Sequence, residues 1–310
     1  MMAFTAKDVK DLREKTGVGM MDCKNALAEA DGDMEKAVTI LREKGLASAA
    51  KKSTRVAAEG VVTALTNDKS GVLVEINCET DFVAGGDMFQ ELASKIAKTA
   101  LDARPDNLDV LLETTCVDGE GTVADEVQEV FLKLRENMKV RRFALIDGHV
   151  VSYIHAKGTV GVLVNFDTDD ETAVSDEFVD MGKNIAMQIA AMNPAYLSEA
   201  DVPAEVIEQE KEINLVQMKE DPKMANKPAQ VLEKIIEGKI AKYYKEMCLL
   251  NQEFVRGDIY EGDVKGYVAS VAKALGKSIT IKSFVRYEKG EGIEKKEENF
   301  AEEIAKMVNK

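Results

Sequence analysis

An internal repeat restricts the possible folds of this chain more than any other feature of its sequence. Residues 61–74 recur as residues 151–164, and both segments carry two apolar runs around a turn, the pattern of a β-hairpin. A helical pattern follows each hairpin, with apolar residues at matching positions: Phe89, Leu92 and Ile96 in the first, and Phe178, Met181 and Ile185 in the second. We therefore predict an α+β fold with a duplicated core of two small antiparallel sheets, each with helices packed on one face.

Residues 1–56 predict a small domain of three helices ahead of the duplicated core. Thr5 followed by Asp8 is a capping-box pattern for the first helix, and Asp33 is placed to cap the third. Gly45 is predicted to end that third helix. The basic, alanine-rich stretch that follows is interpreted as a linker helix.

The remaining segments are assigned by periodicity and by breaks at proline and glycine. An amphipathic helix is expected over residues 122–140, and a strand over residues 278–287 must pair with an earlier sheet, which we assign to the second unit. Two long charged helices separated by Pro222 and Pro228 predict a projecting antiparallel helical hairpin. The predicted division is a three-helix domain and linker, 1–56; a first core unit, 57–143; a second core unit, 144–200 and 251–293; the helical hairpin, 201–250; and a C-terminal helix, 294–310.

Composition argues against several classes of function. The chain has 41 Lys and Arg against 56 Asp and Glu, a formal net charge of −15, and direct nucleic-acid binding needs clustered cations for the phosphates. Its four cysteines show no metal-ligand spacing and suit a reducing compartment. The N-terminal residues carry no apolar signal sequence, and no apolar run is long enough to span a membrane. We therefore expect a cytoplasmic protein.

Motifs for catalysis or cofactor binding are not found in the sequence. No Walker A glycine loop appears, and two histidines nearly exclude catalytic triads and histidine metal sites. We therefore expect no cofactor and no covalent chemistry. The acidic run at residues 167–171 is a weak candidate for a divalent cation, because it lacks the glycine and the distal Glu of an EF-hand loop. The alternative is a solvated acidic turn.

The loop at residues 79–84 differs between the two copies of the repeat. The first copy has Thr80, Asp81, Phe82 and Val83 where the second has residues 170–173, which include no aromatic side chain. A feature present in one of two scaffold copies is not required by the scaffold. Two interpretations remain: the ring folds back under its loop while Asp81 caps the next helix, or the ring enters another protein.

Three segments resemble signatures of a known family. Residues 9–27, which include VKDLR and TGVGMMDCKNAL, closely resemble the N-terminal signature of the bacterial translation elongation factor Ts family. Residues 75–84 (EINCETDFVA) resemble the second signature of that family, and residues 286–295 (RYEKGEGIEK) resemble its C-terminal segment. The order of the parts matches the family along nearly the whole chain.

The resemblance implies a guanine-nucleotide exchange factor, and not an enzyme, that binds elongation factor Tu and promotes GDP release during translation elongation. It also implies an N-terminal domain similar to ubiquitin-associated domains. By match to the family motifs, partner binding with displacement of the partner's Mg²⁺ site falls on Thr80, Asp81, Phe82 and Val83, and further partner binding falls on Met20, Met21, Lys24, Leu134, His155 and Val255.

Some positions depart from the family pattern, and other functions stay open. Arg135 stands where the family often has glycine, and Arg256 where it often has an apolar residue. Gly85 and Gly86 predict a more flexible loop than in many members. The alternatives are an adaptor for ubiquitin-like modifiers or chaperones that uses the three-helix domain, and a metal-dependent hydrolase that uses residues 167–171. The hairpin is interpreted as an inert arm, a partner contact or a homodimer interface.

Overall fold

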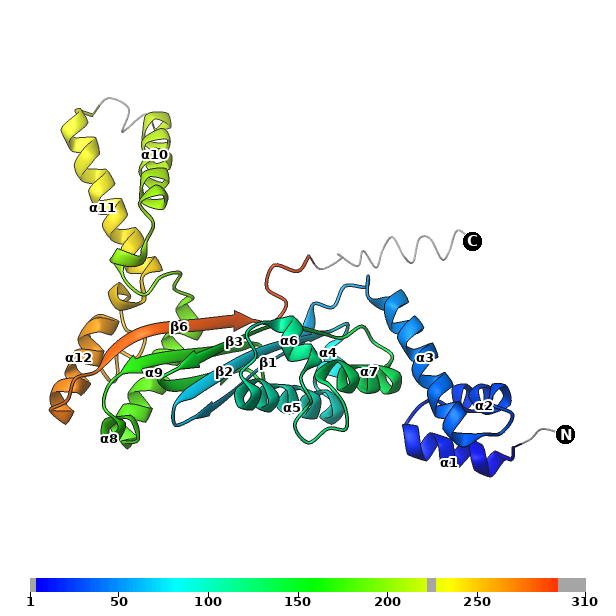
Figure 1. Ribbon diagram of the computed structural model, residues 1–310. Coiled ribbons are helices and arrows are strands. Elements are labelled where there is room, and N and C mark those ends of the chain that lie inside the picture. Colours follow the sequence, from blue (N-terminus) through cyan, green and yellow to red (C-terminus); the bar gives the residue numbers. More distant parts are fainter. Residues whose placement is uncertain (1–3, 222–226, 295–310) are drawn as a thin grey trace.

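The computed structural model describes residues 4–221 and 227–294, which form an elongated molecule of mixed helix and sheet (Figure 1). Two three-stranded antiparallel sheets lie at its centre. This confirms the predicted combination of helices with two small sheets. Residues 222–226 at the hairpin tip, and the predicted C-terminal helix from residue 295 onward, lie outside the described residues. No helix in the described part of the chain is long and apolar enough to cross a membrane.

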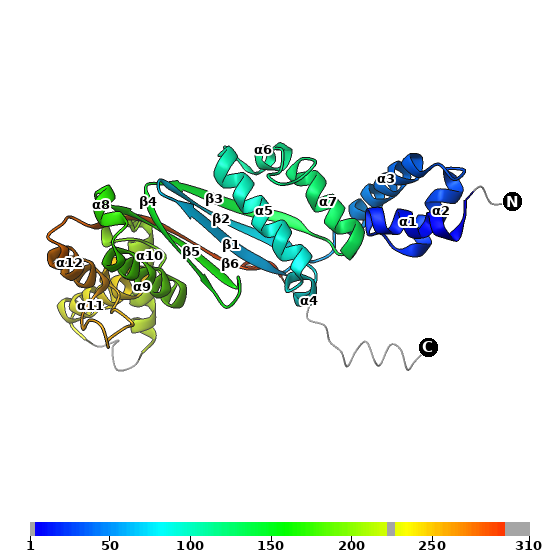
Figure 2. The ribbon, with the colours of Figure 1, turned by 90° about the horizontal axis from the view of Figure 1, so that it is seen from below.

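The N-terminal helices form a domain at one end of the molecule (Figures 1 and 2). Its helices are α1 (Ala6–Thr16), α2 (Met20–Glu29) and α3 (Met34–Lys52). The predicted capping box at Thr5 and Asp8 is present. The buried side chains of the domain are Val9, Leu12, Val18, Cys23, Ala26, Leu27, Ala30, Ala37 and Leu41, joined by Leu132 from the first core unit. Because Leu132 completes this core, the domain is docked onto the rest of the molecule.

The first core unit is a sheet of order β1-β2-β3 with helices on its outer face. Its elements are β1 (Glu59–Asn67), β2 (Ser70–Cys78), α4 (Asp81–Ala84), α5 (Asp87–Ala103), α6 (Leu108–Glu113), α7 (Val123–Leu134) and β3 (Lys139–Asp147). β2 is buried along its whole length, with Val72 and Val74 packed in the core under α5 and Leu73 packed toward the second sheet. This alternation follows from the two-residue period of a strand. Figure 2 shows α5 lying across this sheet.

The second core unit repeats this plan and carries the hairpin as an insertion. Its elements are β4 (His149–His155), β5 (Val160–Asp167), α8 (Asp170–Ala173), α9 (Asp176–Met192), the hairpin helices α10 (Ala204–Glu220) and α11 (Ala229–Met247), α12 (Val264–Leu275) and β6 (Thr280–Glu288). β6 pairs with β5, which confirms the assignment of the last strand to the second unit. α10 and α11 project from the body as the predicted hairpin (Figure 1).

The duplication extends well beyond the hairpin and helix that the sequence reveals. Equal lengths pair α4 with α8, α5 with α9, α7 with α12 and β3 with β6. The register shifts at the same place in both central strands, after Glu75 and after Asn165. This structural alignment pairs Phe82 with Glu171. The sequence comparison, which set Phe82 opposite Thr172, was wrong by one residue because β5 is one residue shorter than β2.

The first sheet extends further along the chain than the sequence predicts. β3 runs to Asp147 and pairs with β2, so residues 144–147 belong to the first sheet and the predicted boundary after residue 143 was placed too early. The chain leaves the first sheet at Gly148, whose φ of 124° is open mainly to glycine. The apolar run of residues 143–146 is continuous with the strand before it, and this explains why no break was visible inside it.

Two helices end at other residues than predicted. α7 stops at Leu134 and does not continue to residue 140, because Arg135 takes a left-handed conformation with a φ of 61°. α3 continues through Gly45 to Lys52. Gly45 is buried against α7, where a Cβ atom would overlap the side chain of Leu132. This glycine therefore permits close packing of two helices and does not end one.

The inner faces of the two sheets pack together, and a buried ionic cluster joins them at one end. Apolar side chains that meet between the sheets include Val62, Leu73 and Leu163. The buried carboxylate of Glu75 accepts hydrogen bonds from Arg141 (2.9 Å), Arg142 (2.6 Å) and the N–H of Gly290 just beyond β6 (2.8 Å). Burial alone would raise the pKa of Glu75, but these donors outweigh it and hold that pKa below its ordinary value of 4.5. The cluster thus fixes one core unit against the other.

Candidate functional site

The loop after β2 forms a single helical turn, α4, which exposes an aromatic ring. Thr80 caps this turn, because its hydroxyl accepts a hydrogen bond from the N–H of Val83 at 3.2 Å. Val83 is buried, whereas Phe82 is 88% exposed. The residue that precedes α5 is Gly86, so Asp81 does not cap that helix. The interpretation in which the ring folds back under its own loop is therefore wrong.

Hydrogen bonds hold the backbone on both sides of the ring. The N–H of Gly85 donates to the carbonyl of Asp81 at 2.9 Å, and the N–H of Gly86 donates to the carbonyl of Val83 at 3.0 Å. The side chain of Gln90 donates to the carbonyl of Ala84 at 2.6 Å. Both glycines take backbone conformations that any residue adopts. They lie in a hydrogen-bonded turn and not in an open loop.

Residues just after α7 hold the base of the turn. The carboxylate of Glu136 accepts hydrogen bonds from the N–H of Thr80 at 3.0 Å and from its hydroxyl at 2.7 Å. The adjacent Glu79 accepts a hydrogen bond from the N–H of Asn137 at 2.7 Å and forms an ion pair with Arg55 at 3.3 Å. The turn is therefore tied to both the first core unit and the segment after α3.

A groove of about 540 Å³ lies beside α4 and is shared by the two core units. Asp81 of α4 lines it, together with Ile154 and Lys157 from the end of β4 and the turn that follows. His155 is exposed at the same strand end, with its Nδ1 atom 3.0 Å from the hydroxyl of Tyr153. The structure thus brings two predicted contact points, α4 and His155, to the same region from different copies of the repeat.

The predicted contact residues of α2 are exposed: Met20 (43%), Met21 (63%) and Lys24. Asp22, in the same turn of the helix, forms an ion pair with Arg135 at 2.6 Å. Arg135 immediately precedes Glu136, which holds the base of α4. The position where the family often has glycine is left-handed in this chain, and its arginine links the N-terminal domain to the segment beside the exposed ring.

Two further predicted contact residues do not line the groove beside α4. Leu134 is half-buried and packs against the core of the first unit. Val255 is exposed in the second unit, where its N–H donates to the buried side chain of Gln188 at 2.8 Å. The next residue, Arg256, forms a bidentate ion pair with Asp258 at 2.7 and 2.8 Å. Its guanidinium group is thus engaged within the chain.

Sequence reasoning missed two residues that belong to the surroundings of α4. Met88 is exposed at the start of α5, and its structural equivalent in the second copy is Glu177. The same comparison of copies that singled out Phe82 could have found Met88. Glu136 corresponds to Lys277 after α12. The sequence carried no signal for this pair, because the segments that follow α7 and α12 share too little sequence to be aligned without the structure.

The acidic run at residues 167–171 is engaged within the second core unit. Asp169 caps α8 by accepting a hydrogen bond from the N–H of Thr172 at 2.9 Å. Lys277 forms ion pairs with Asp169 at 3.3 Å and with Glu171 at 2.9 Å. In residues 4–221 and 227–294, no group of three or more His, Cys, Asp and Glu side chains is arranged to hold a metal ion. These carboxylates serve as a helix cap and as ion-pair partners.

The cysteines lie in the core and not at a reactive site. All four are free and buried. Burial raises the pKa of Cys78 to about 12 and that of Cys248 to about 11. The thiolate is the reactive form of cysteine, and these two groups stay protonated near neutral pH. The cysteines therefore act as small apolar side chains in packing.

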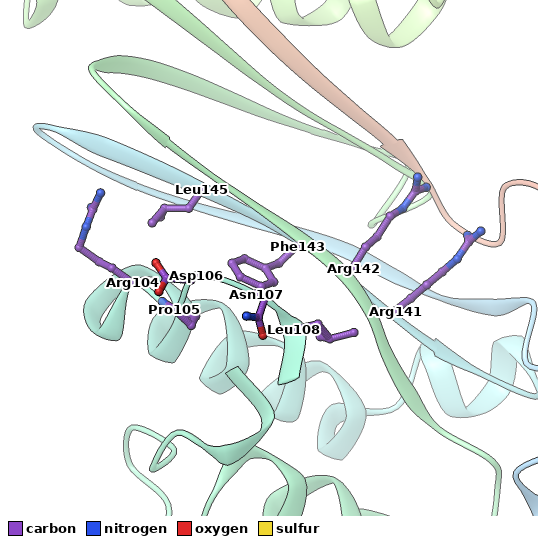
Figure 3. Close-up of a pocket in the computed structure, with 9 residues that line it drawn as sticks. All are labelled: Arg104, Pro105, Asp106, Asn107, Leu108, Arg141, Arg142, Phe143 and Leu145. Carbon is purple, nitrogen blue, oxygen red and sulfur yellow. The ribbon is translucent and has the colours of Figure 1, made fainter. Parts of the chain in front are cut away.

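A pocket beside β3 contains three arginines that do not converge on one point (Figure 3). Arg104 pairs with Asp147 at 2.5 Å, while Arg141 and Arg142 bind Glu75. Figure 3 shows Arg104 at one end of the pocket and the other two side chains directed away from it at the opposite end. Because all three arginines already pair with carboxylates of the chain and point in different directions, the pocket is not built to hold a common anion.

Comparison with known proteins identifies the family of the chain. The family model described as Elongation factor TS matches residues 79–291. Curated proteins named Elongation factor Ts match almost from end to end. Those of Clostridium acetobutylicum and Clostridium botulinum are each 48% identical, over 98% and 99% of both chains. That of Clostridium perfringens is 48% identical over 99% of this chain and 100% of its own. With its exposed ring set in the second family signature, the chain belongs to the elongation factor Ts family.

Proposed function

We propose that the chain is the guanine-nucleotide exchange factor for elongation factor Tu, acting in the cytoplasm during translation elongation and performing no covalent chemistry. The observation that carries this proposal is Phe82, a ring that is 88% exposed on a turn held by hydrogen bonds from the N–H groups of residues 83–86. Large exposed apolar side chains on a rigid support are typical anchors of protein interfaces. Thr80, Asp81 and Val83 hold that ring in place.

The mechanism we propose is a coupling free energy between two ligands of the same partner. A factor that binds nucleotide-free elongation factor Tu more tightly than the GDP-bound form weakens GDP binding by the same factor. Burial of a phenyl ring contributes roughly 1.5–3 kcal/mol, and about 1.4 kcal/mol corresponds to each tenfold change in rate. Phe82 could therefore supply one or two decades of acceleration. Displacement of the partner's Mg²⁺ ion would amplify this, because that ion is the largest local charge holding the diphosphate.

The other proposed contacts lie on separate parts of the chain. The exposed face of α2, with Met20, Met21 and Lys24, is proposed to bind the nucleotide domain of the partner. Leu134 is proposed as a contact of the first core unit, and His155 and Val255 as contacts of the second. Their support is the exposure of these side chains and, for His155, a position between Ile154 and Ala156, which line the groove shared with α4. Leu134 has less support, since it is half-buried.

We also propose the hairpin as a contact surface for the partner or for a second copy of the chain. Its interior holds Met218, Ile236 and Ile240, while Ile213 and Val216 stay exposed on α10. Sedimentation velocity of the free chain, alone and mixed with elongation factor Tu, separates these choices. Replacement of both exposed residues by Lys is expected to weaken whichever association the hairpin mediates.

Stopped-flow measurement of GDP release from elongation factor Tu tests the proposed function. The wild-type chain is expected to accelerate release, and Phe82→Ala is expected to lose roughly 10-fold to 100-fold of that acceleration. The matched control is Glu171→Ala, at the equivalent position of the second copy. With this variant, elongation factor Tu should release GDP as fast as with the wild-type chain. A wild-type chain that leaves the release rate unchanged would refute the proposal.

A further inference from the structure

Glu136 makes contacts that are unusual for an acidic residue at the molecular surface. Both of its carboxylate oxygens bind one residue, Thr80, through the backbone N–H at 3.0 Å and the hydroxyl at 2.7 Å. Hydrogen bonds to an ionised group are about twice as strong as neutral ones. Thr80 is also the cap of α4, so Glu136 holds the residue from which the turn carrying Phe82 begins.

The second core unit places a different residue at the same position for the same purpose. Lys277 follows α12 as Glu136 follows α7, and in both cases the intervening residue is left-handed. Lys277 binds Asp169, the cap of α8, and also Glu171, the structural equivalent of Phe82. In the second copy, therefore, the holding residue binds the tip of the turn itself. In the first copy it binds the cap alone and leaves the tip free.

The neighbours of Glu136 connect the same segment to the N-terminal domain. Arg135 forms an ion pair with Asp22 of α2 at 2.6 Å, and its carbonyl accepts a hydrogen bond from Lys52 at the end of α3. On the other side, the N–H of Asn137 donates to Glu79 at 2.7 Å. Three consecutive residues thus join the N-terminal domain to the base of the turn that carries the ring.

We propose that Glu136 is a positioning residue for nucleotide release: it fixes the direction in which Phe82 points and, through Arg135, keeps that direction constant relative to the exposed face of α2. This inference rests on the proposed function. A ring held in its bound orientation loses less conformational entropy when it enters the partner. Two contact points held at a fixed separation also engage the same partner more readily than two that move independently.

The test measures GDP release with Glu136→Ala and Glu136→Gln, each alone and combined with Phe82→Ala. Glu136→Ala is expected to lower the acceleration about tenfold, the change expected when a charge-assisted contact is lost. Glu136→Gln retains one acceptor oxygen and should fall between it and the wild type. Since Glu136 acts through the ring, adding Glu136→Ala to Phe82→Ala should cause little further loss.

Lys277→Ala is the matched control, because it removes the equivalent holding residue of the second copy. It should leave the release rate at the wild-type value. A wild-type release rate for Glu136→Ala would overturn the inference, and so would a double variant whose loss equals the product of the two single losses. Neither result would affect the proposed function, which is tested by the wild-type chain and Phe82→Ala. A defect in Lys277→Ala as large as that in Glu136→Ala would also overturn it, since the effect would then be one of general stability.

Amide hydrogen exchange of the free chain tests the same contact without the partner. In Glu136→Ala, the amides of Thr80, Ala84 and Gly85 should exchange faster than in the wild type, while amides in the core of β2 should be unchanged. Unchanged exchange at residues 80–85 would contradict the role of Glu136 even if release were slower. Thermal unfolding of each variant identifies any that fails to fold, and Glu136→Gln then carries the test.

Discussion

The two core units share one backbone plan for the turn that follows their central strand. Each turn begins with a capping side chain, Thr80 or Asp169, that accepts a hydrogen bond from the N–H three residues later. The residue that provides this N–H, Val83 or Thr172, is buried in both units. These two positions are therefore determined by the fold, because one must satisfy a helix end and the other must fill the core.

The residue between these two positions is where the copies differ. In the second unit Glu171 points to solvent and pairs with Lys277, so the turn is closed off by an ion pair within the chain. In the first unit Phe82 stands exposed. The comparison teaches that the scaffold leaves this position free, so the fold itself does not require the apolar ring found there.

A second difference lies inside the core, at the register shift of each central strand. Glu75 is bound there by two arginines and by the N–H of Gly290. Asn165 occupies the same place in the second unit and donates a hydrogen bond to the carbonyl of Asp147 at 2.9 Å. Both units thus have a buried polar group where the strand is irregular, but only that of the first unit is charged.

The largest expected effect comes from removal of this buried charge. Glu75→Ala should lower the free energy of unfolding by about 3–5 kcal/mol, because it removes the buried carboxylate that two guanidinium groups and a backbone N–H share. Asn165→Ala, the matched change, should cost about 1–2 kcal/mol, since one neutral hydrogen bond is lost. Urea unfolding of both variants measures the difference. Equal costs would mean that the ionic cluster adds nothing to the junction of the two sheets.

The next effect concerns the exposed turns and is measured as the rate of GDP release, not as a change in stability. Phe82→Glu makes the first turn like the second, and it should slow GDP release from elongation factor Tu roughly a hundredfold, because a charge must then enter an apolar site. Glu171→Phe makes the opposite change and should not accelerate release. Both side chains are exposed, so the free energy of unfolding should change by less than about 0.5 kcal/mol.

The double variant with Phe82→Glu and Glu171→Phe sharpens this comparison. If it restores the wild-type release rate, the two turns are interchangeable and the connection of the first turn to the N-terminal domain has no importance. We expect no restoration, because the ion pair between Asp22 and Arg135 connects the N-terminal domain to the first turn.

Acid should remove the extra stability that the charged Glu75 gives to the first core unit. The pKa of Glu75 is lowered in the folded state, so its stabilising contribution is complete above the ordinary pKa of 4.5 and is lost as the pH falls through the lower folded-state value. Glu75→Gln, which mimics the protonated form, should be less stable than the wild type at pH 7, and the gap in melting temperature should narrow below pH 4.5. Asn165→Ala should keep the acid dependence of the wild type. A gap that stays constant down to pH 3 would exclude Glu75 as its source.

The sequence predicts those parts of the fold that leave a periodic pattern within a short stretch. The repeated hairpins, the helices after them and the last strand were predicted for this reason. Phe82 became a candidate because the two copies of the repeat differ in the loop that carries it. Features that depend on contacts between distant segments were not predictable. Gly45 resembles a helix end in sequence, but it allows close packing against Leu132. Glu136 binds Thr80 only because the fold brings the end of α7 next to that residue. Local signals cannot distinguish these cases.

The smallest expected effect tests the comparison at the start of the long helices α5 and α9. Ser175 caps α9 by accepting a hydrogen bond from the N–H of Phe178 at 3.3 Å, whereas Gly86, at the same place before α5, offers no side chain. The two residues have nearly the same backbone angles, with φ of −78° and −72° and ψ of 142° and 145°. Gly86→Ser should therefore raise the free energy of unfolding by about 0.5 kcal/mol, through the added cap and a less flexible unfolded chain.

The expected gain in the free energy of unfolding is small because a Cβ atom on Gly86 would lie 3.3 Å from the carbonyl oxygen of Val83, which is a tight contact. Ser175→Gly is the matched variant and should lose a similar amount, as measured by thermal unfolding of both. If Gly86→Ser is destabilising while Ser175→Gly behaves as expected, the first turn does not tolerate a side chain that the second accepts. Glycine at this position would then be required by the tighter turn that presents Phe82, and the two turns would differ in backbone as well as in side chain.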